Sequence, residues 1–221
     1  VRARGVTLLD PTPADVERAQ RANANLVRVR AQGTPPAVAD ACDRRGMLLW
    51  QDLPLTGAGG FDAGRGRDVA AAVVGSVGHH PSLAAVAVHD EPVRPYADGL
   101  GSGTLDRFRY RVRAWRATYD DSDARDVADG IDAVPTFPVV GPPGIDADAV
   151  TLYPGWRYGR AEDVAWLCDH YGVGDVVAGY GAGALGTDSP GDETGFDREI
   201  HDGRVSGDAT DSQRYQARVV Q

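Results

Sequence analysis

The strongest fold signal in the chain is His79-His80-Pro81-Ser82-Leu83-Ala84-Ala85-Val86-Ala87-Val88-His89-Asp90-Glu91-Pro92. Its six consecutive small or aliphatic residues are typical of a strand buried on both faces, as in a parallel sheet. Ligands of parallel α/β folds lie at the carboxyl ends of the strands. Asp90 and Glu91 are therefore candidates for chemistry; the alternative is that they are solvated carboxylates that close the strand.

Strands and helices alternate on both sides of this stretch. Further strands are expected at residues 1–9, 26–31, 47–53, 125–131, 149–156 and 175–181. Helices are expected at residues 12–24, 36–46, 68–77, 105–119, 164–171 and 211–220. Proline-rich residues 134–144 and residues 183–207, rich in Gly, Asp, Ser and Thr, are expected to be connections, the second lying over the carboxyl-end face.

Two sets of residues in these helices are interpreted as core. The long helix after the central strand carries an apolar stripe at steps of three and four residues, formed by Leu105, Phe108, Val112, Trp115 and Tyr119. Such a stripe more often packs into a core than binds a ligand. Cys42 and Cys168, the only cysteines, have neither metal-ligand nor disulfide spacing and are expected to be small core residues.

Seven strands alternating with helices predict an α/β fold, either a (β/α)8 TIM barrel or a doubly wound sheet. Because no Gly-x-Gly-x-x-Gly follows the first strand, the barrel is preferred over a dinucleotide-binding sheet. An eighth strand is not evident, so the barrel is expected to be incomplete here. Residues 1–221 are expected to form one domain, excised from a longer multidomain protein.

Composition excludes some partners. The net charge is −9, the chain contains no lysine, and aspartate outnumbers glutamate. Such a surface repels nucleic acid and anionic lipid, and it is typical of proteins from salt-loving organisms. No signal peptide opens the sequence and no apolar run is long enough to span a bilayer. We therefore expect a soluble domain with no membrane segment. A cytoplasmic location is favoured, but the compartment stays open because an excised domain can lack its targeting segments.

Several separated motifs, taken in order, resemble the catalytic barrel of family 2 glycoside hydrolases, the group of β-galactosidases, β-glucuronidases and β-mannosidases. They are Asn25-Leu26-Val27-Arg28, Cys42-Asp43-Arg44-Arg45-Gly46-Met47-Leu48-Leu49-Trp50-Gln51-Asp52, His80-Pro81-Ser82 leading to Asp90-Glu91, Tyr153-Pro154-Gly155-Trp156, Gly179-Tyr180-Gly181-Ala182 and Tyr215-Gln216. No single motif is specific. The series, however, spans nearly the whole chain.

The resemblance implies double displacement at an anomeric carbon by two carboxyl groups. Glu91 matches the acid/base position, but Gly179 stands where the family has its nucleophilic glutamate. Asp90 also replaces the usual asparagine, His79 replaces the asparagine before His80, and Ala31 stands where many members carry a histidine. Loss of the nucleophile removes the covalent route, at a cost of roughly 5 kcal/mol or more in barrier.

The sequence therefore predicts a degenerate glycosidase barrel, without cofactor or metal, that binds a carbohydrate or serves as a structural module. Tyr153 and Trp156 are candidates to stack on a pyranose ring, and Arg28, Asp52, Asp90 and Glu91 are candidates to bind its hydroxyls. The alternative for Arg28 and Asp52 is a buried ion pair, and the alternative for Trp156 is a cap on the barrel edge.

Two further hypotheses remain open. An active β-glycosidase would pair Glu91 with a relocated loop carboxylate, the candidates being Asp188, Asp192, Glu193 and Asp197. An unrelated barrel enzyme would use His79, His80 or His89 with Asp52 as metal ligands. Of these histidines only His89 is expected at the carboxyl end of a strand, because His79 and His80 precede the strand.

Overall fold

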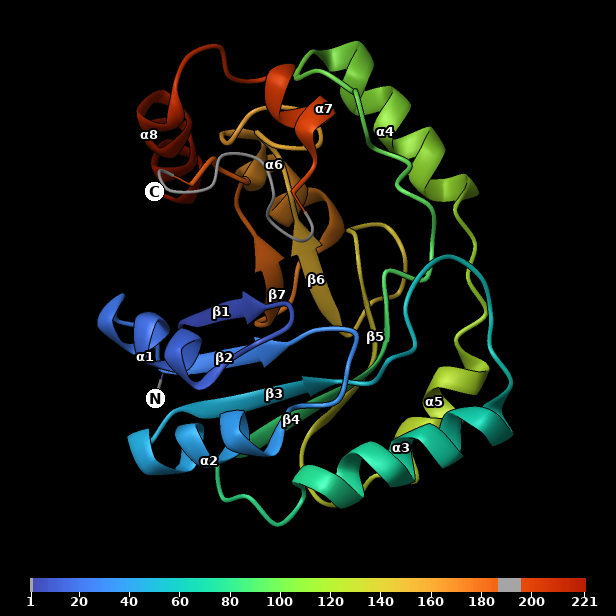
Figure 1. The fold of residues 1–221 in the computed structure, drawn as a ribbon. Coiled ribbons are helices and arrows are strands. Elements are labelled where there is room, and N and C mark those ends of the chain that lie inside the picture. Colours follow the sequence, from blue (N-terminus) through green and yellow to red (C-terminus); the bar gives the residue numbers. More distant parts are fainter. Residues whose placement is uncertain (1, 187–195) are drawn as a thin grey trace. The chain divides into compact units, whose positions relative to one another are not determined.

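The computed structural model describes residues 2–186 and 196–221, in which the chain divides into two compact units. The first unit comprises Val1–Arg94 and Tyr119–Gly141, and the second comprises Pro95–Thr118 and Pro142–Gln221. Parallel strands alternate with helices in both units (Figure 1), as the sequence predicts. No helix in the described part of the chain is long and apolar enough to cross a membrane.

A parallel sheet of five strands forms the first unit. In chain order, which is also their pairing order, the strands are β1 (Gly5–Leu8), β2 (Leu26–Val29), β3 (Leu48–Asp52), β4 (Leu83–Asp90) and β5 (Thr136–Gly141). The helices are α1 (Pro13–Arg21), α2 (Pro36–Arg45), α3 (Ala63–Val77) and α5 (Ser122–Ala128). Helices α3 and α5 lie side by side in Figure 1 and contact one another.

Strand β4 is the central strand that the apolar run predicts. Val86, Ala87 and Val88 are fully buried, so side chains pointing to either face of the strand are removed from water. Burying each valine contributes roughly 1.5–3 kcal/mol. Asp90 is its last residue, which places the Asp90-Glu91 pair at the carboxyl end of the strand, as expected.

Local signals set the ends of the helices. The backbone N–H of Thr12 donates to Asp15 Oδ2 at 2.8 Å, which caps the start of α1. Gly46 and Gly172 end α2 and α6 (Asp163–Tyr171) in the left-handed conformation, with φ of 63° and 58°. Glycine adopts this conformation at little cost, and both helix ends are as the sequence predicts.

The sequence-based prediction for residues 125–144 is wrong. Residues 125–131 were expected to be the fifth strand, but residues 125–128 belong to α5. The buried residues of this helix are Ala124, Val127 and Ala128. That spacing is helical. The fifth strand is β5, inside the residues expected to form a proline-rich connection. Pro138 lies within it, and buried Val139 and Val140 pair with His89 and Asp90 of β4.

Helices outnumber strands in the second unit. Its elements are α4 (Thr104–Arg116), β6 (Ala149–Leu152), α6, β7 (Val177–Tyr180), α7 (Arg198–Asp202) and α8 (Ala209–Val220). Strands β6 and β7 pair in parallel. The core comprises Ala97, Leu100, Tyr110, Ala114, Val150, Leu152, Tyr158 and Leu167.

Helix α4 buries a different face from the one expected. Tyr110 and Ala114 are 2 % exposed and join the core, whereas Phe108 and Trp115 of the predicted stripe are 59 % and 79 % exposed. Leu105 is also exposed, and Tyr119 lies beyond the end of the helix. The spacing of apolar residues indicated an amphipathic helix. It did not indicate which face is buried, because the core residues that pack against α4 come from distant parts of the chain.

Candidate functional site

A buried network of charged side chains joins β2, β3 and β4 at their carboxyl ends. The guanidinium of Arg28 donates to both carboxylate oxygens of Asp52, at 2.7–3.0 Å, and Nη2 also donates to Asp90 Oδ1 at 2.8 Å. The side chains of Arg28, Asp52 and Asp90 are 4 %, 1 % and 1 % exposed. The structure thus contains the buried ion pair that was the alternative reading of Arg28 and Asp52.

Arg30 completes the network, a role that sequence reasoning missed. Its Nε donates to Asp90 Oδ2 at 2.5 Å, and its side chain is 31 % exposed. Two guanidinium groups therefore face two carboxylates. The spacing Arg28-x-Arg30 on a strand was the available signal, because alternate residues point to the same face.

Burial and ion pairing act in opposite directions on the pKa values of this network. Burial disfavours the charged form of Arg28, but Asp52 and Asp90 outweigh it and raise the pKa of Arg28 above its usual value. Burial raises the pKa of Asp52 to about 6, although Arg28 acts in the opposite direction. Removing one member would leave a buried charge without its partner, which is strongly destabilising.

Glu91 follows directly after this network. Its backbone has φ of 55°, the left-handed region that non-glycine residues seldom occupy, and its N–H donates to the carbonyl of Val140 at 2.9 Å. The side chain is partly exposed. Strained backbone of this kind concentrates at functional sites and persists only where the surroundings enforce it. Here the buried Asp90 and the hydrogen bond to β5 enforce it.

The second unit contains Gly179, which the sequence resemblance aligns with a nucleophile position. Gly179 lies on β7 opposite Thr151 of β6, and Tyr153 follows the end of β6. A Cβ atom on Gly179 would lie 2.8 Å from the hydroxyl oxygen of Tyr153, closer than such contacts occur in proteins. A side chain at residue 179 would therefore require the Tyr153 hydroxyl to shift.

Trp156 is only 8 % exposed. Its ring centroid lies 6.4 Å from that of Phe196 and 6.5 Å from that of His201, and its carbonyl accepts from Arg204 Nε at 2.9 Å. The hydroxyl of Tyr215, part of the Tyr-Gln motif, donates to the carbonyl of Gly155. These contacts fix the loop after β6 and leave little of the indole to face solvent.

The candidate histidines divide between two places. His89, at the end of β4, donates from Nε2 to the carbonyl of Gly57 at 3.0 Å, and its Nδ1 lies 2.5 Å from the hydroxyl oxygen of Tyr119. Burial lowers the pKa of His89. His80 precedes β4, as expected, and its Nδ1 lies 2.7 Å from Asp43 Oδ2.

The His80 group is the one set of described residues that has the make-up of a metal site. Donor atoms of Asp40, Asp43 and His80 lie within 4.8 Å of one another. Asp43 also accepts from the backbone N–H of Ser82 at 3.0 Å. This link ties α2 to the residues before β4, which is sufficient to explain the Cys-Asp and His-Pro-Ser motifs as structural.

Of the four candidate loop carboxylates, Asp197 lies within the described residues. Asp188, Asp192 and Glu193 lie outside the described residues. Asp197 accepts from the backbone N–H of Ile200 at 3.0 Å and so caps α7. Burial raises the pKa of Asp98, with Arg157 opposing and Asp197 adding to the shift.

A second polar chain, which the sequence did not reveal, joins α7 to α8. His201 Nδ1 lies 2.9 Å from Asp202 Oδ1, and its Nε2 lies 2.9 Å from Ser212 Oγ. The order of groups is that of a hydrolytic triad. Ser212 is completely buried, however, and accepts from the backbone N–H of Leu185. We therefore interpret this chain as a structural link.

Comparisons with models of protein families and with curated proteins found no match. Solved structures of glycosidases are similar in fold. One is Parabacteroides merdae β-glucuronidase with glycerol in its active site, at 16 % identity and a TM-score of 0.60 over 100 % of this chain and 29 % of that one. Another is a putative β-galactosidase from Bacteroides fragilis, at 17 % identity and a TM-score of 0.59 over 98 % of this chain and 33 % of that one.

A third is Bacteroides uniformis β-glucuronidase, at 16 % identity and a TM-score of 0.56 over 100 % of this chain and 28 % of that one. The chain spans about a third of the length of these structures. At these identities the likeness concerns the fold. It confirms the predicted α/β class: the chain has a (β/α)8 barrel fold like that of glycosidases, with seven strands among the described residues.

Proposed function

We propose that this chain is a degenerate glycosidase barrel of the family 2 type, which binds a β-glycoside but does not hydrolyse it by the retaining mechanism. The observation that carries the proposal is the pair Gly179 and Tyr153. A glycine offers no atom to attack an anomeric carbon, and the tyrosine hydroxyl already occupies the start of the missing side chain. Hydrolysis through a covalent glycosyl-enzyme requires a carboxylate there.

Glu91 is proposed to keep the position of the general acid/base. Three features support this role: its place at the end of β4, its partial exposure and its left-handed backbone. A carboxyl group that is held at a strand end can bind a glycosidic oxygen or hydroxyl even where no nucleophile assists it.

The remaining predicted residues receive different roles. Arg28, Asp52 and Asp90 are committed to one another, so we assign them the task of fixing the strand ends beside Glu91. Tyr153 is proposed to donate its hydroxyl to the sugar from the position of the lost carboxylate. Trp156, largely buried, is proposed to support the loop that carries Tyr153.

The test is a panel of nitrophenyl β-glycosides, namely glucoside, galactoside, mannoside and glucuronide, offered to the protein in high salt. Binding is measured by calorimetry and turnover by release of nitrophenol. We expect at least one glycoside to bind, Glu91→Gln to weaken that binding, and turnover to be absent. Turnover that disappears in Glu91→Gln would contradict the proposal and favour a relocated nucleophile. Failure of every glycoside to bind would also contradict it and leave only a structural role.

A further inference from the structure

Helix α4 differs in charge from the rest of the chain. Its residues Thr104–Arg116 include five arginines and a single aspartate, in a protein whose net charge is −9. Arg107 pairs with Asp163, and Arg109 pairs with Asp106 on the same helix. These two ion pairs offset two of the five arginines, and the helix still carries an excess of positive charge. It attracts an anionic partner that the acidic remainder of the chain would repel.

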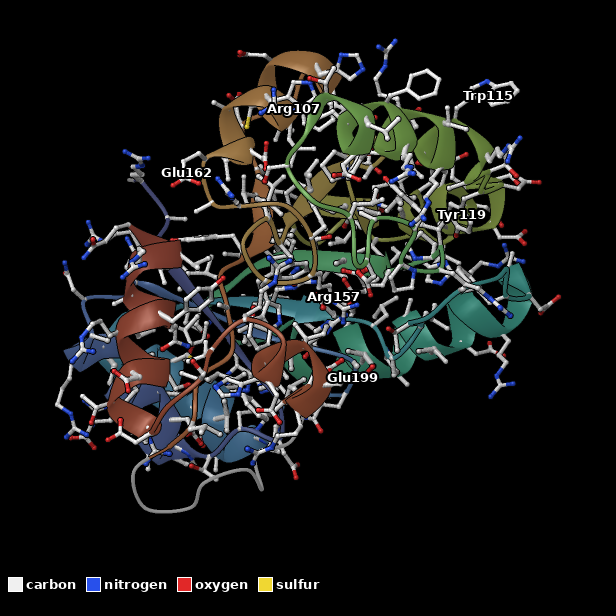
Figure 2. All side chains as sticks on the ribbon, turned by 90° about the horizontal axis from the view of Figure 1, so that it is seen from above. Arg107, Trp115, Tyr119, Arg157, Glu162 and Glu199 are labelled. Atoms are coloured by element: carbon white, nitrogen blue, oxygen red, sulfur yellow. The ribbon has the colours of Figure 1, made fainter. Side chains whose placement is uncertain are left out.

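Exposed aromatic residues accompany these arginines. Phe108 is 59 % exposed and Trp115 is 79 % exposed. Figure 2 shows Trp115 projecting from α4 away from the ribbon. Single exposed apolar residues need no explanation, but several on one helical face mark a binding surface. An exposed indole offers a flat apolar face, onto which the C–H face of a pyranose ring can stack.

A pocket of about 430 Å³ lies beside this face and wholly within the second unit. Its lining residues are Phe108, Arg111, Val112, Ala114 and Trp115 of α4 together with Gly144, His170 and Tyr171. The volume is in the range of small-molecule sites, and aromatic walls with a few polar groups are typical of such sites. The pocket is open to solvent on one side, and its volume is sufficient for a single sugar unit.

The polar groups of the pocket define the ligand. The guanidinium of Arg111 is a donor of the geometry that suits a carboxylate. His170 stacks its exposed ring on Trp166, with ring centroids 5.6 Å apart. The hydroxyl oxygen of Tyr171 is buried and has no hydrogen-bond partner among the described residues. Because this hydroxyl is shielded from solvent, the polar side chains of the pocket that a ligand can reach are Arg111 and His170, which are both exposed.

We propose that this pocket binds an anionic sugar, a uronic-acid unit of a glycan, with Trp115 stacked on the pyranose ring and Arg111 paired with the carboxylate. Neither Glu91 nor Gly179 lines this pocket, so the inference does not depend on the function proposed for them. It combines the three chemical features of a uronate: an apolar ring face, hydroxyls and a negative charge.

The test uses a matched pair of probes, the tetrasaccharide of β-linked glucuronic acid and cellotetraose, which differ in carrying a carboxylate or a hydroxymethyl group. Binding to the whole protein is measured by calorimetry at low and high salt. Trp115→Ala and Arg111→Gln are compared with Arg109→Gln, which removes the same charge from the same helix outside the pocket. Circular dichroism verifies folding, which is expected to persist because all three side chains are exposed.

We expect the uronate to bind at least tenfold more tightly than cellotetraose. Trp115→Ala and Arg111→Gln are each expected to weaken its binding tenfold or more, and Arg109→Gln less than threefold. Equal binding of the two probes would overturn the inference, as would equal losses in Arg111→Gln and Arg109→Gln. Uronate binding that survives both pocket variants would place the ligand elsewhere and overturn it too, without bearing on Gly179. Absence of glycan binding together with Trp115-dependent self-association would show that a second copy covers the face.

Discussion

The hydroxyl oxygen of Tyr153 lies 2.8 Å from the point at which a Cβ atom on Gly179 would stand. Gly179 lies on β7 and pairs with Thr151 of β6, and Tyr153 directly follows the end of β6. The glycine is therefore built into its surroundings, and a larger side chain cannot return without moving the tyrosine. This relationship links the proposed loss of the nucleophile to a measurable packing constraint.

Packing around Gly179 can be tested by stability alone. Gly179→Ala is expected to lower the free energy of unfolding by about 1–3 kcal/mol, because the new methyl group overlaps the Tyr153 hydroxyl. Gly174→Ala is the matched control, since a Cβ there meets no atom within 4 Å; it is expected to be neutral or slightly stabilising. Urea unfolding measures both. Adding Tyr153→Phe should relieve the penalty, and an equal effect of the two glycine variants would refute the packing constraint.

The buried charge network predicts a second difference in stability. Arg28→Met leaves Asp52 and Asp90 buried without their shared cation and is expected to cost about 3–5 kcal/mol. Arg18→Met removes an exposed pair with Asp15 and is expected to cost less than about 1 kcal/mol. Urea unfolding at neutral pH compares the two. Similar losses would mean that the network contributes no more than a surface ion pair.

His89 predicts a dependence of stability on pH. Burial lowers its pKa in the folded protein below the usual 6.5, so the unfolded chain binds a proton at higher pH than the folded chain does. The stabilisation is complete above pH 6.5 and is lost as the pH falls from 6.5 through the folded-state pKa. Unfolding curves should therefore become less pH-dependent in this range for His89→Gln. They should stay unchanged for His79→Gln, an exposed control, and parallel curves for wild type and His89→Gln would contradict this assignment.

Under the proposed function, Gly179 supplies no nucleophile, and small anions should be able to replace it. Azide can attack the anomeric carbon of a nitrophenyl β-glycoside, forming a carbon–nitrogen bond as the bond to nitrophenol breaks and Glu91 supplies the departing proton. We expect turnover that depends on azide and is absent without it. One displacement inverts the anomeric centre, so the product should be the α-glycosyl azide, identified by nuclear magnetic resonance. A β-configured azide would show instead that a carboxylate of the protein attacks first.

Much of the fold follows from sequence because its signals are local. The apolar run of β4, the cap at Thr12 and the glycines that end α2 and α6 can all be read from neighbouring residues. The fifth strand could not, because Pro138 argues against a strand and the pairing of β5 with β4 joins residues that are remote in sequence. The apolar pattern also predicted the wrong buried face of α4, since Phe108 and Trp115 are exposed while Tyr110 and Ala114 are buried.

The candidate site divides in the same way. The places of Glu91 after β4 and of Gly179 on β7 could be predicted because both residues stand in motifs at strand ends, whereas their roles stay a prediction. The commitment of Arg28 to Asp52 and Asp90, the part of Arg30 and the approach of Tyr153 to Gly179 could not. Each depends on distances between residues that are remote in sequence, and a linear pattern does not contain those distances.

The most direct measurement of the central claim is turnover of nitrophenyl β-glycosides by the double variant Gly179→Glu with Tyr153→Phe, in which the carboxylate returns and the obstructing hydroxyl is removed. The account predicts hydrolysis on the order of a thousandfold or more above wild type, lost again when Glu91→Gln is added. A folded double variant that binds the glycoside yet shows no gain, or a gain that does not depend on Glu91, would contradict the claim that only the nucleophile has been lost.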